Sequence, residues 1–502
     1  MSNAEFIVVS TDTYRTIILR LSGELCIKSP QVRRRFQDRL LHNIRMALEN
    51  AGITEYKLIR HWSRMDVEVN DPRAPEILAR VYGIQGVIPA YAYPWETLED
   101  IVEIGERLYR EKVVGKTFAV RSKRVGNRGN IPFASMDLGR ALGSSLHAQS
   151  AGVDLDNPEV VVGVEVRENN VFFLDDELVG PGGLPMGSEG KAVALMSGGF
   201  DSAVAAYMMQ KRGIDLDFIF FNLGGPAHER GVRDVTKMLC ERWSNGYQAK
   251  FHIVDLRPIV ADMKDNVSGS YWQLLLKRLM MRASHMICEE EGYPAMITGE
   301  SAGQVSSQTL MNLAAIQTSV LTPILRPLVG LNKEDIIALA RIIGTHDLSA
   351  DVPEFCALDG GRPVTNGSAK RLDREEERVS RKLLESLVEH RKTLKVCEMR
   401  GGADMLESDL EVDSLVEGAV MIDLRTSAAR SKWKVPDAVE MDFDTAVGNV
   451  AYLPKEATYL LLCDVGLKSA FLADMMRKMG FKAHSFRRGT RALRRHLETM
   501  AA

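Results

Sequence analysis

Residues 197–202 bring together two glycines, two serine hydroxyls and one carboxylate, in the order Ser-Gly-Gly-Phe-Asp-Ser. The apolar residues 192–196 before them predict a buried parallel strand, and the helix-forming residues 203–209 after them predict a helix. A turn between a strand and a helix points backbone N–H groups at an anion, and glycines let the chain approach phosphate oxygens closely. Because the Gly-x-x-x-x-Gly-Lys-Ser/Thr spacing of a Walker A loop is missing, we predict a phosphate-binding turn of another kind. The alternative is an ordinary strand–turn–helix unit without a ligand.

Cys463 is a cysteine whose surroundings in the sequence suit chemistry. It follows the strand-like residues 459–462 and stands on a glycine-containing loop that opens a predicted helix. N–H donors at such a place stabilise a thiolate or a persulfide. Cys356 lies in a short loop that begins at Pro353. The other four cysteines show neither disulfide rhythm nor zinc spacing, so they predict buried core thiols and no metal site: Cys26, Cys240, Cys288 and Cys397.

The composition is that of a soluble globular protein. The chain has 502 residues, 45% hydrophobic and 26% charged, which predicts three or more domains with their own cores. Since its net charge is only −3, a nucleic-acid partner would have to be met by local basic patches. No segment reaches the ~18 apolar residues of a membrane span, and the N-terminus, where residues 1–4 look like a cloning scar, lacks a signal peptide. The cysteine usage predicts a reducing cytoplasm.

Alternating strands and helices predict the element that holds the phosphate-binding turn. They indicate a doubly wound parallel sheet whose ligand lies at the carboxyl ends of the strands. Residues 299–309 directly follow a predicted strand and so belong to this binding edge. Further along, Asn332 predicts the cap of a helix that begins at Lys333. The predicted strands of this sheet after the first are residues 218–221, 251–254 and 295–298.

Three other segments have simple interpretations. Residues 181–187, rich in glycine and proline, predict a linker. Residues 369–396 predict one long charged helix. The last hundred or so residues predict a second small α/β unit, in which strand 419–425 ends in Asp-x-Arg.

The N-terminal part predicts mixed α and β structure with local basic clusters. Residues 16–21 predict a strand, and residues 31–50 an amphipathic helix. The polar face of that helix is interpreted as a solvated face rather than an RNA contact, although it carries Arg33, Arg34, Arg35 and Arg39. A later loop carries cations beside flexible glycines, which suits contact with a phosphate backbone: Lys123, Arg124 and Arg128.

These motifs together resemble the tRNA 4-thiouridine synthases of the rhodanese-fused class. Residues 197–202 match the Ser-Gly-Gly-x-Asp-Ser PP-loop of ATP pyrophosphatases, and residues 299–309 match the family pattern Gly-Glu-x-x-Gly-Gln-Val-x-Ser-Gln-Thr. Residues 23–28 resemble the family's Gly-Glu-x-x-x-Lys turn, and residues 121–124 look like part of a THUMP domain. The Cys463 loop looks like that of a rhodanese, except that Asp464 stands where rhodaneses often have arginine.

The resemblance implies a multidomain α/β protein. It implies a ferredoxin-like domain over residues 5–65 and a THUMP RNA-binding domain over residues 66–178. It further implies a doubly wound PP-loop ATP pyrophosphatase domain over residues 188–398, where adenylation takes place, and a rhodanese-like domain over residues 404–498.

The resemblance also implies an activity, an ATP-dependent transfer of sulfur to C4 of a tRNA uridine, position 8 in the family. ATP is cut to AMP and pyrophosphate, and Asp201 serves adenylation through Mg²⁺ or by capping the helix. Lys333 activates the uridine, and Cys463 carries a persulfide received from a cysteine desulfurase. Cys356 forms a disulfide with Cys463 during turnover. The positions implied to contact the nucleotide are Leu195, Met196, Ser197, Gly198, Gly199, Asp201, Ser202, Phe220, Phe221, Lys277, Arg278, Gly299 and Gln308.

The partners implied by the resemblance are tRNA, the desulfurase, a sulfur-carrier protein for the thiamine thiazole and a second copy of the chain, with no membrane. One alternative is another PP-loop tRNA-modifying enzyme with ammonia or an amine as nucleophile, but such an enzyme needs neither Cys356 nor Cys463. A second alternative is a non-catalytic RNA-binding or sulfur-carrier protein. The intact turn at residues 197–202 argues against it.

Overall fold

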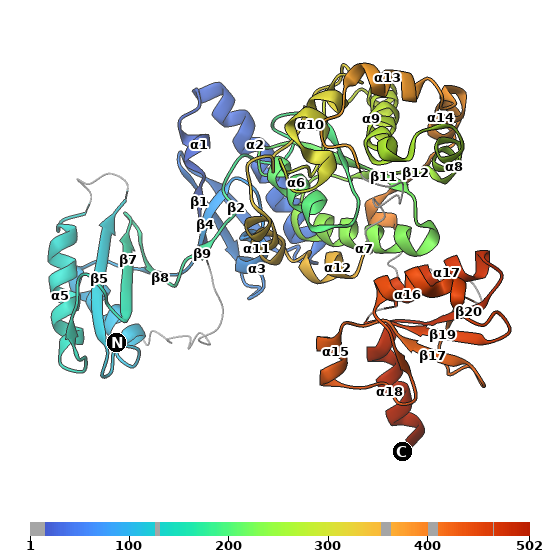
Figure 1. The fold of residues 1–502 in the computed structure, drawn as a ribbon. Coiled ribbons are helices and arrows are strands. Elements are labelled where there is room, and N and C mark those ends of the chain that lie inside the picture. The colour runs from blue at the N-terminus through green and yellow to red at the C-terminus, as the bar shows by residue number, and fades with distance from the viewer. Residues whose placement is uncertain (1–15, 126–130, 353–362, 400–409, 465, 502) are drawn as a thin grey trace. The chain divides into compact units, whose positions relative to one another are not determined.

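The computed structural model describes residues 16–125, 131–352, 363–399, 410–464 and 466–501. The chain divides into two compact units, one made of residues up to Ser188 with Lys211–Gly213, the other of Glu189–Gln210 with Ile214–Ala502. Figure 1 shows their helices and strands. Within the ranges described, no helix is long and apolar enough to cross a membrane.

The first unit is built on one nine-stranded sheet. Eight strands follow the order β2-β3-β1-β4-β8-β7-β5-β6, and the ninth, β9, pairs with β4. The long strand β4 joins two domains, because its first part pairs with β1 and its last part with β8. The strands are β1 (Thr16–Leu21), β2 (Tyr56–Arg60), β3 (Arg64–Val69), β4 (Ile84–Pro94), β5 (Thr117–Arg124), β6 (Gly152–Val153), β7 (Val160–Val166), β8 (Asn170–Leu174) and β9 (Leu178–Val179).

Helices cover the two halves of this sheet. The predicted strand at residues 16–21 and helix at 31–50 are confirmed as β1 and α2 (Pro30–Asn50), whose apolar face buries Phe36 and Leu40 against the sheet. Helix α2 is flanked by two short helices, α1 (Gly23–Cys26) and α3 (Ala74–Leu78). In the second half, α4 (Leu98–Tyr109) and α5 (Ser135–His147) pack on β5 and its neighbours, as Figure 1 shows for α5.

The structure adds detail at two predicted boundaries. The boundary predicted between residues 65 and 66 falls inside β3, which pairs with β1, so the first domain continues beyond it. The glycine- and proline-rich residues 181–187, predicted as a linker, directly precede the end of the first compact unit at Ser188, and they are packed. Met186 is fully buried, and its carbonyl accepts hydrogen bonds from Arg39 (2.8 Å) and Asn43 (3.0 Å). The linker is therefore held by tertiary packing, which its composition alone does not indicate.

The second unit contains the predicted doubly wound sheet, with order β14-β13-β10-β11-β12-β15. Its strands are parallel except β15, which runs antiparallel at the edge beside β12. All residues of the central strand β11 (Asp215–Asn222) are buried, as expected of a parallel strand covered on both faces. The other strands are β10 (Lys191–Leu195), β12 (Lys250–Asp255), β13 (Met296–Ile297), β14 (Ile324–Leu325) and β15 (Lys392–Lys395).

Helices follow these strands in alternation. These helices are α6 (Phe200–Gln210), α7 (Gly225–Trp243), α8 (Arg257–Asn266), α9 (Trp272–Glu291), α10 (Leu310–Gln317), α11 (Lys333–Ile343) and α12 (His346–Asp351). The long helix predicted over residues 369–396 is wrong. The segment forms α13 (Ala369–Glu376), α14 (Arg381–Glu389) and then β15. The Ser380 hydroxyl accepts from the Leu383 N–H (3.2 Å) and begins a new helix, and pairing with β12 overrides helical propensity at its end.

The C-terminal residues form a five-stranded parallel sheet with order β16-β20-β19-β17-β18. The predicted strand that ends in Asp-x-Arg is β17 (Val420–Asp423), next to β19 (Thr458–Leu462). Helix α17 (Leu467–Lys478) follows β19, so the loop between them lies at the carboxyl edge of the sheet. The remaining elements are β16 (Glu411–Val412), α15 (Ser427–Lys432), β18 (Val439–Glu440), α16 (Phe443–Asn449), β20 (Lys482–Phe486) and α18 (Gly489–Ala501).

Candidate active site

The turn between β10 and α6 has the shape that its sequence predicts. Gly198 has φ +84°, a backbone conformation that favours glycine, and a Cβ there would lie 2.9 Å from a Val352 methyl. The Ser202 hydroxyl accepts from the Ser197 N–H (3.3 Å) and donates to the Gly199 carbonyl (3.0 Å). Ser202 therefore holds the turn in shape from inside, since it is only 5% exposed.

Asp201 joins three segments that are far apart in the sequence. Its carboxylate accepts from Lys333 Nζ at 2.7 Å through one oxygen and from Gln304 Nε2 at 2.8 Å through the other. Asp201 lies in the first turn of α6, Gln304 in the loop after β13, and Lys333 at the start of α11, which Asn332 caps by accepting from the Asp335 N–H (2.9 Å). The predicted Asn332 cap is thus confirmed. A carboxylate, an amide and an ammonium meet at the carboxyl edge of the sheet.

Gly299 brings the loop after β13 against the phosphate-binding turn. A Cβ at this position would lie 2.6 Å from the Asp201 carbonyl carbon and 2.8 Å from the Ser202 nitrogen. Any larger residue would therefore push the two loops apart. Gln308 closes the same loop from within, because its Oε1 accepts from the Ser301 N–H (3.4 Å).

The buried carboxylate of Glu300, in the loop after β13, pairs with two cations. Glu300 contacts Lys277 (3.2 Å) and Arg326 (2.8 Å), and its pKa stays below the usual range, although burial raises it, because both cations lower it. Arg326 was not predicted, and only its place directly after the short strand β14 could have indicated it. The cluster keeps positive charge at the carboxyl edge of the sheet, where phosphates would lie.

The other residues predicted to contact the nucleotide lie in different surroundings. Arg278 is buried and its guanidinium pairs with Asp373 and Glu376 on α13, away from its neighbour Lys277. Leu195 is the last residue of β10 and the buried Met196 follows it, while Phe220 and Phe221 are buried within β11. For these residues contact with nucleotide remains a prediction.

His228 is a residue of this site that the sequence did not indicate. It lies near the start of α7, is 4% exposed and packs edge-on to Phe220, with 4.8 Å between ring centroids. A hydrogen bond to the Ser197 backbone raises the pKa of the imidazole, but burial outweighs it and lowers the pKa to about 3. Because the bond favours the protonated ring, the ring is its donor and the Ser197 carbonyl its acceptor. A neutral imidazole thus anchors the first residue of the turn.

The buried His228 predicts how stability depends on pH. Its pKa in the folded protein is about 3, below the ordinary 6.5, so the unfolded chain binds one more proton between these values. Stability is therefore lost as pH falls through 6.5, with a contribution of up to about 1.4 kcal/mol per pH unit. We expect His228→Gln to lose stability less steeply than wild type in urea unfolding from pH 7 to pH 4.5. His390→Gln, at an exposed histidine, is the control and should follow wild type.

The residues present fit ATP, while Mg²⁺ would find few protein ligands. Gln304 Oε1 is buried without a hydrogen-bond partner, so the site holds an acceptor that a ligand hydroxyl or amine could satisfy. Among the described residues no group of three or more His, Cys, Asp or Glu could hold a metal. Mg²⁺ that travels with phosphates commonly takes one or two carboxylates from the protein, and Asp201 is the carboxylate placed for this.

Cys463 stands on the loop between β19 and α17, where N–H groups converge on its sulfur. Sγ accepts from the Gly466 N–H (3.1 Å) and the Ser469 N–H (3.4 Å), and the Ser469 hydroxyl lies 3.3 Å away. Cys463 is 4% exposed. Donors at a helix N-terminus stabilise a sulfur anion, as the sequence predicted for this position.

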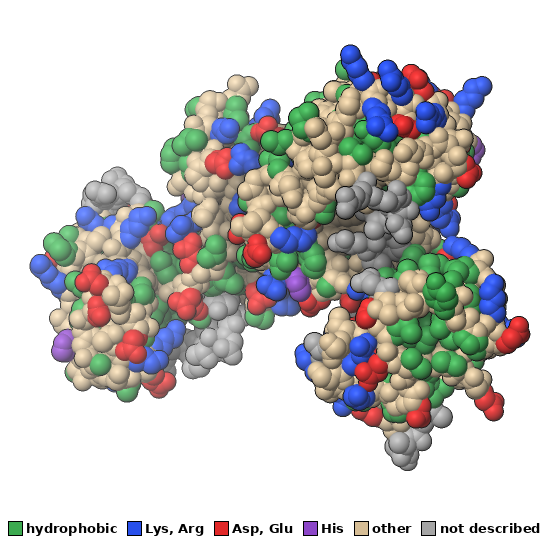
Figure 2. Space-filling model, in the orientation of Figure 1, with side chains coloured by type: hydrophobic (Ala, Val, Ile, Leu, Met, Phe, Trp, Pro, Cys, Tyr) green, Lys and Arg blue, Asp and Glu red, His purple; other side chains and the backbone are tan. Residues whose placement is uncertain are grey.

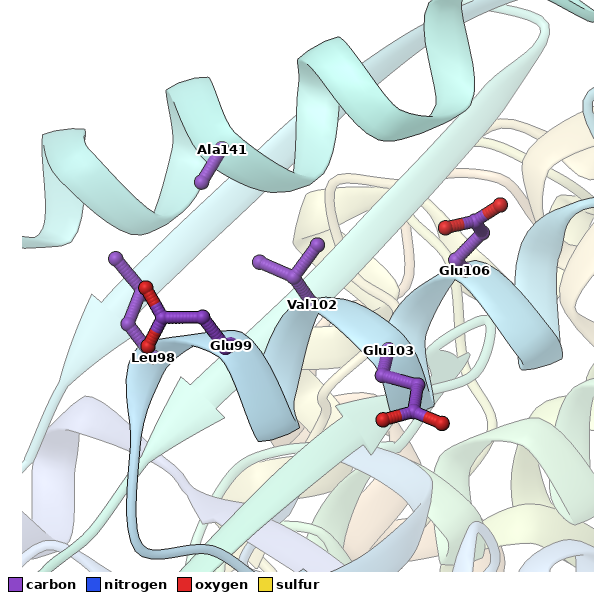
Figure 3. A pocket seen from close by; sticks show the side chains of 6 residues that line it. All are labelled: Leu98, Glu99, Val102, Glu103, Glu106 and Ala141. Carbon is purple, nitrogen blue, oxygen red and sulfur yellow. The ribbon is translucent and has the colours of Figure 1, made fainter.

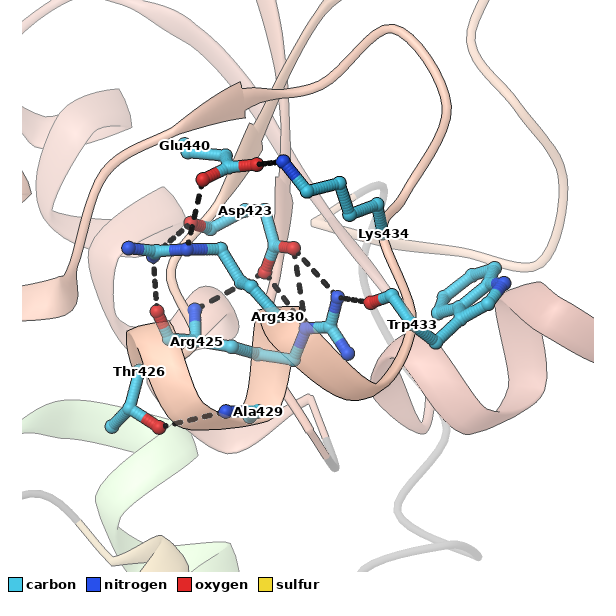
Figure 4. A network of polar contacts seen from close by, with 8 residues as sticks. All are labelled: Asp423, Arg425, Thr426, Ala429, Arg430, Trp433, Lys434 and Glu440. Atoms are coloured by element: carbon cyan, nitrogen blue, oxygen red, sulfur yellow. Dashed lines mark hydrogen bonds and ion pairs between the residues drawn. The ribbon is translucent and has the colours of Figure 1, made fainter.

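The Asp-x-Arg motif of β17 forms the network of Figure 4. Arg425 donates from Nη2 to Asp423 (2.7 Å) and to the Trp433 carbonyl (2.8 Å), and the hydrogen bonds to Asp423 raise the pKa of the guanidinium. Both side chains are buried. The Arg425 charge interacts with Cys463, but the ion pair with Asp423 offsets that charge, so the network adds little net positive potential at the sulfur.

The other thiols are less suited to nucleophilic chemistry. Burial raises the pKa of Cys240 and of Cys288 to about 12, so both stay protonated at neutral pH. The prediction of a core thiol is wrong for Cys397, which is exposed, and the residues Cys26 and Cys240 are only partly buried. The five cysteines that the structure describes are all thiols rather than disulfides. Cys356 lies outside the described residues.

The basic loop predicted to contact RNA is only partly described. Lys123 is exposed at the end of β5, whereas Arg124 turns inward and donates to the Phe133 carbonyl (2.6 Å). Arg128 lies outside the described residues. A cavity of about 280 Å³ between α4 and α5 does not suit phosphates, because Glu99, Glu103 and Glu106 line it (Figure 3).

Comparison with known proteins agrees with this arrangement. Family models match for the ThiI ferredoxin-like domain over residues 16–88, for a THUMP domain over residues 96–174 and for "Thiamine biosynthesis protein (ThiI)" over residues 187–380. The tRNA sulfurtransferase of Pyrobaculum aerophilum is 36% identical over 484 residues, which are 95% of this chain and 97% of that protein. The chain belongs to the tRNA sulfurtransferase (ThiI) family. The tRNA sulfurtransferases of Thermoplasma acidophilum and Escherichia coli are each 35% identical to it over 92% of this chain. The matched part covers 93% of the Thermoplasma protein and 98% of the Escherichia coli protein.

Two solved structures are similar to this sulfurtransferase-family chain. A crystal structure described as a 4-thiouridine synthetase–RNA complex with bound ATP matches with a TM-score of 0.67 at 30% identity, over 76% of this chain and 99% of that one. PH1313 from Pyrococcus horikoshii shares the fold, with a TM-score of 0.52 at 23% identity over 66% of this chain. The ferredoxin-like, THUMP and PP-loop domains predicted from the sequence are thereby confirmed, and a rhodanese-like C-terminal domain stays a prediction.

Proposed function

We propose that this member of the tRNA sulfurtransferase family adenylates a tRNA uridine, position 8 in the family it resembles, and replaces its O4 with sulfur carried by Cys463. The observation that carries the adenylation half is the meeting of Lys333 and Gln304 on Asp201 beside the phosphate-binding turn. It supports the proposal because an ammonium next to this turn can stabilise charge that develops as uridine and ATP react. The RNA and ATP described in the similar structure agree with it.

The proposed reaction has two halves. Uridine O4 attacks the α-phosphorus of ATP, the bond to the bridging oxygen breaks, and pyrophosphate leaves with its electron pair. The adenylated oxygen is now a better leaving group than hydroxide. The terminal sulfur of a Cys463 persulfide then attacks C4, and AMP leaves with the former carbonyl oxygen.

Release of the product then involves the second cysteine. The Cys356 thiolate attacks Sγ of Cys463, the bond to the transferred sulfur breaks, and 4-thiouridine leaves with that sulfur. The resulting Cys356–Cys463 disulfide needs two electrons from an external thiol reductant to return to two thiols. The N–H groups around Cys463 support its part of the proposal, because they stabilise a sulfur anion both before and after transfer.

The chain's own residues supply the positioning. Gly198 and Gly199 leave their backbone open to phosphate oxygens, His228 anchors Ser197, and Lys277 adds positive charge near the nucleotide. Mg²⁺, when bound, would neutralise phosphate charge, with Asp201 as its protein carboxylate. The persulfide is proposed to come from a cysteine desulfurase. The same Cys463 sulfur could pass to a thiazole sulfur-carrier protein, which the ThiI family description favours.

The test is reconstitution followed by nucleoside analysis. Wild-type protein with ATP, Mg²⁺, unmodified tRNA, a thiol reductant, and a cysteine desulfurase with cysteine is expected to give 4-thiouridine, AMP and pyrophosphate. The proposal is wrong if no 4-thiouridine forms. AMP together with a different modified nucleoside would favour a PP-loop enzyme that uses another nucleophile.

A further inference from the structure

Trp62 is exposed in the turn between β2 and β3, on the first unit. The residue is 64% exposed, and it is the only tryptophan among the described residues whose surface is mostly in contact with solvent. Leaving so much aromatic surface in water forgoes the free energy of burying it, so the position calls for an explanation. Packing within this unit does not supply one.

The turn that carries Trp62 is held in place. Gln37, a buried residue of α2, donates from Nε2 to the carbonyls of His61 and Trp62, each at 3.2 Å. The His61 N–H donates to the Arg64 carbonyl (3.0 Å), and the His61 ring lies 2.9 Å from the buried Asp66 carboxylate. The ring is therefore presented on an ordered turn, and a ligand that packs on it pays little ordering cost.

A cation without an ion pair among the described residues lies over the exposed ring, and two more arginines follow it on the same helix. The Arg33 guanidinium lies over Trp62, 4.8 Å from the ring centroid, one helical turn before Gln37 on the same face of α2. Among the described residues none of Arg33, Arg34 and Arg35 forms an ion pair, whereas the nearby Arg60 is neutralised by Asp38. Figure 2 shows basic and acidic side chains together over most of the face in view, with another group of basic side chains over α13 and α14. A local excess of positive charge thus coincides with an exposed aromatic ring.

We propose that Trp62 and Arg33 form a stacking site for an unpaired nucleotide of RNA, with Arg34 and Arg35 contacting the adjoining phosphates. A base can stack on an aromatic ring or a guanidinium plane, and this is how unpaired nucleotides are commonly held. Uncompensated arginines favour RNA over a protein partner, because phosphates neutralise them without regard to sequence. The site rests on the proposed function for its ligand, a tRNA substrate. It also revises the interpretation of the arginine face of α2 as merely solvated.

The test compares Trp62→Ala with wild type in binding to unmodified tRNA and to a blunt RNA duplex, using the full-length protein. We expect Trp62→Ala to weaken tRNA binding about 5- to 100-fold and to leave duplex binding unchanged. Trp62→Phe should restore most of the affinity, and Tyr452→Ala, at an 84% exposed aromatic residue of the C-terminal domain, is the matched control. Arg34→Gln should lower the salt dependence of binding by about one counterion, whereas Trp62→Ala should not.

The outcomes separate this site from the proposed function. If wild type makes 4-thiouridine but Trp62→Ala binds tRNA as wild type does, the stacking site is wrong and the proposed function stands. Equal weakening for tRNA and duplex would also overturn it, because a stacking site needs an unpaired base. Loss of binding to a desulfurase, with RNA binding kept, would assign the surface to a protein partner and overturn the proposal. An unchanged ATP requirement and melting temperature should accompany the expected result.

Discussion

Asp201→Asn is expected to lower ATP-dependent AMP formation by at least about 100-fold while the fold is kept. The amide preserves the size of the side chain but removes the negative charge that holds Lys333 Nζ at 2.7 Å. It also replaces an acceptor oxygen by an NH₂ group facing either Lys333 or Gln304, both of which are donors. The three loops of the site should then separate locally. The measurement is release of labelled AMP and pyrophosphate with saturating unmodified tRNA.

The control for this experiment lies on the same helix as Lys333. Glu334 is exposed in the first turn of α11, so Glu334→Gln removes one negative charge nearby without touching the meeting point of the loops. It should leave AMP formation close to wild type. If Asp201→Asn forms AMP at a normal rate, the role given to Asp201 is wrong. If Glu334→Gln is equally impaired, general electrostatics rather than the Asp201 contacts governs the reaction.

Cys463→Ala is expected to abolish sulfur transfer, to below about 1% of wild type, and to leave adenylation intact. The physical reason is that Sγ is the atom that the N–H groups of Gly466 and Ser469 surround, whereas Asp201 and its partners lie in another domain. The measurement is a pair of assays on one preparation, AMP formation with ATP and tRNA, and 4-thiouridine formed with desulfurase and cysteine. AMP without 4-thiouridine is the expected result.

Cys397→Ser is the matched control for that variant, because Cys397 is an exposed thiol in the same compact unit. Because Cys397 has no proposed role in sulfur transfer, the Cys397→Ser variant should form 4-thiouridine at the wild-type rate. Normal thiolation by Cys463→Ala would show that another residue carries the sulfur. Equal loss of activity in both variants would indicate damage to the protein rather than loss of a carrier.

The sequence by itself determined the elements and the chemistry that each can do. The apolar run before Ser197 predicted strand β10, and the Ser-Gly-Gly-Phe-Asp-Ser order predicted the turn, because strand burial and glycine conformation are local properties. The same holds for Asn332 as a helix cap and for the loop that presents Cys463 to N–H donors. Local patterns failed where pairing with a neighbouring strand decided the structure, as in the segment that became α13, α14 and β15.

Only the tertiary structure decided which of these residues meet. Nothing in the local pattern placed Gln304 and Lys333 on the two oxygens of Asp201, since that depends on how parallel strands bring their following loops to one edge. His228 likewise acquired its role from burial against Phe220 and from the Ser197 backbone, which no motif marks. Two adjacent residues of α9 also have different partners, because Lys277 pairs with Glu300 and Arg278 pairs with Asp373. The spacing of residues in the sequence thus predicts which groups can bind phosphate or carry sulfur, whereas tertiary packing decides which side chains form hydrogen bonds and ion pairs with them.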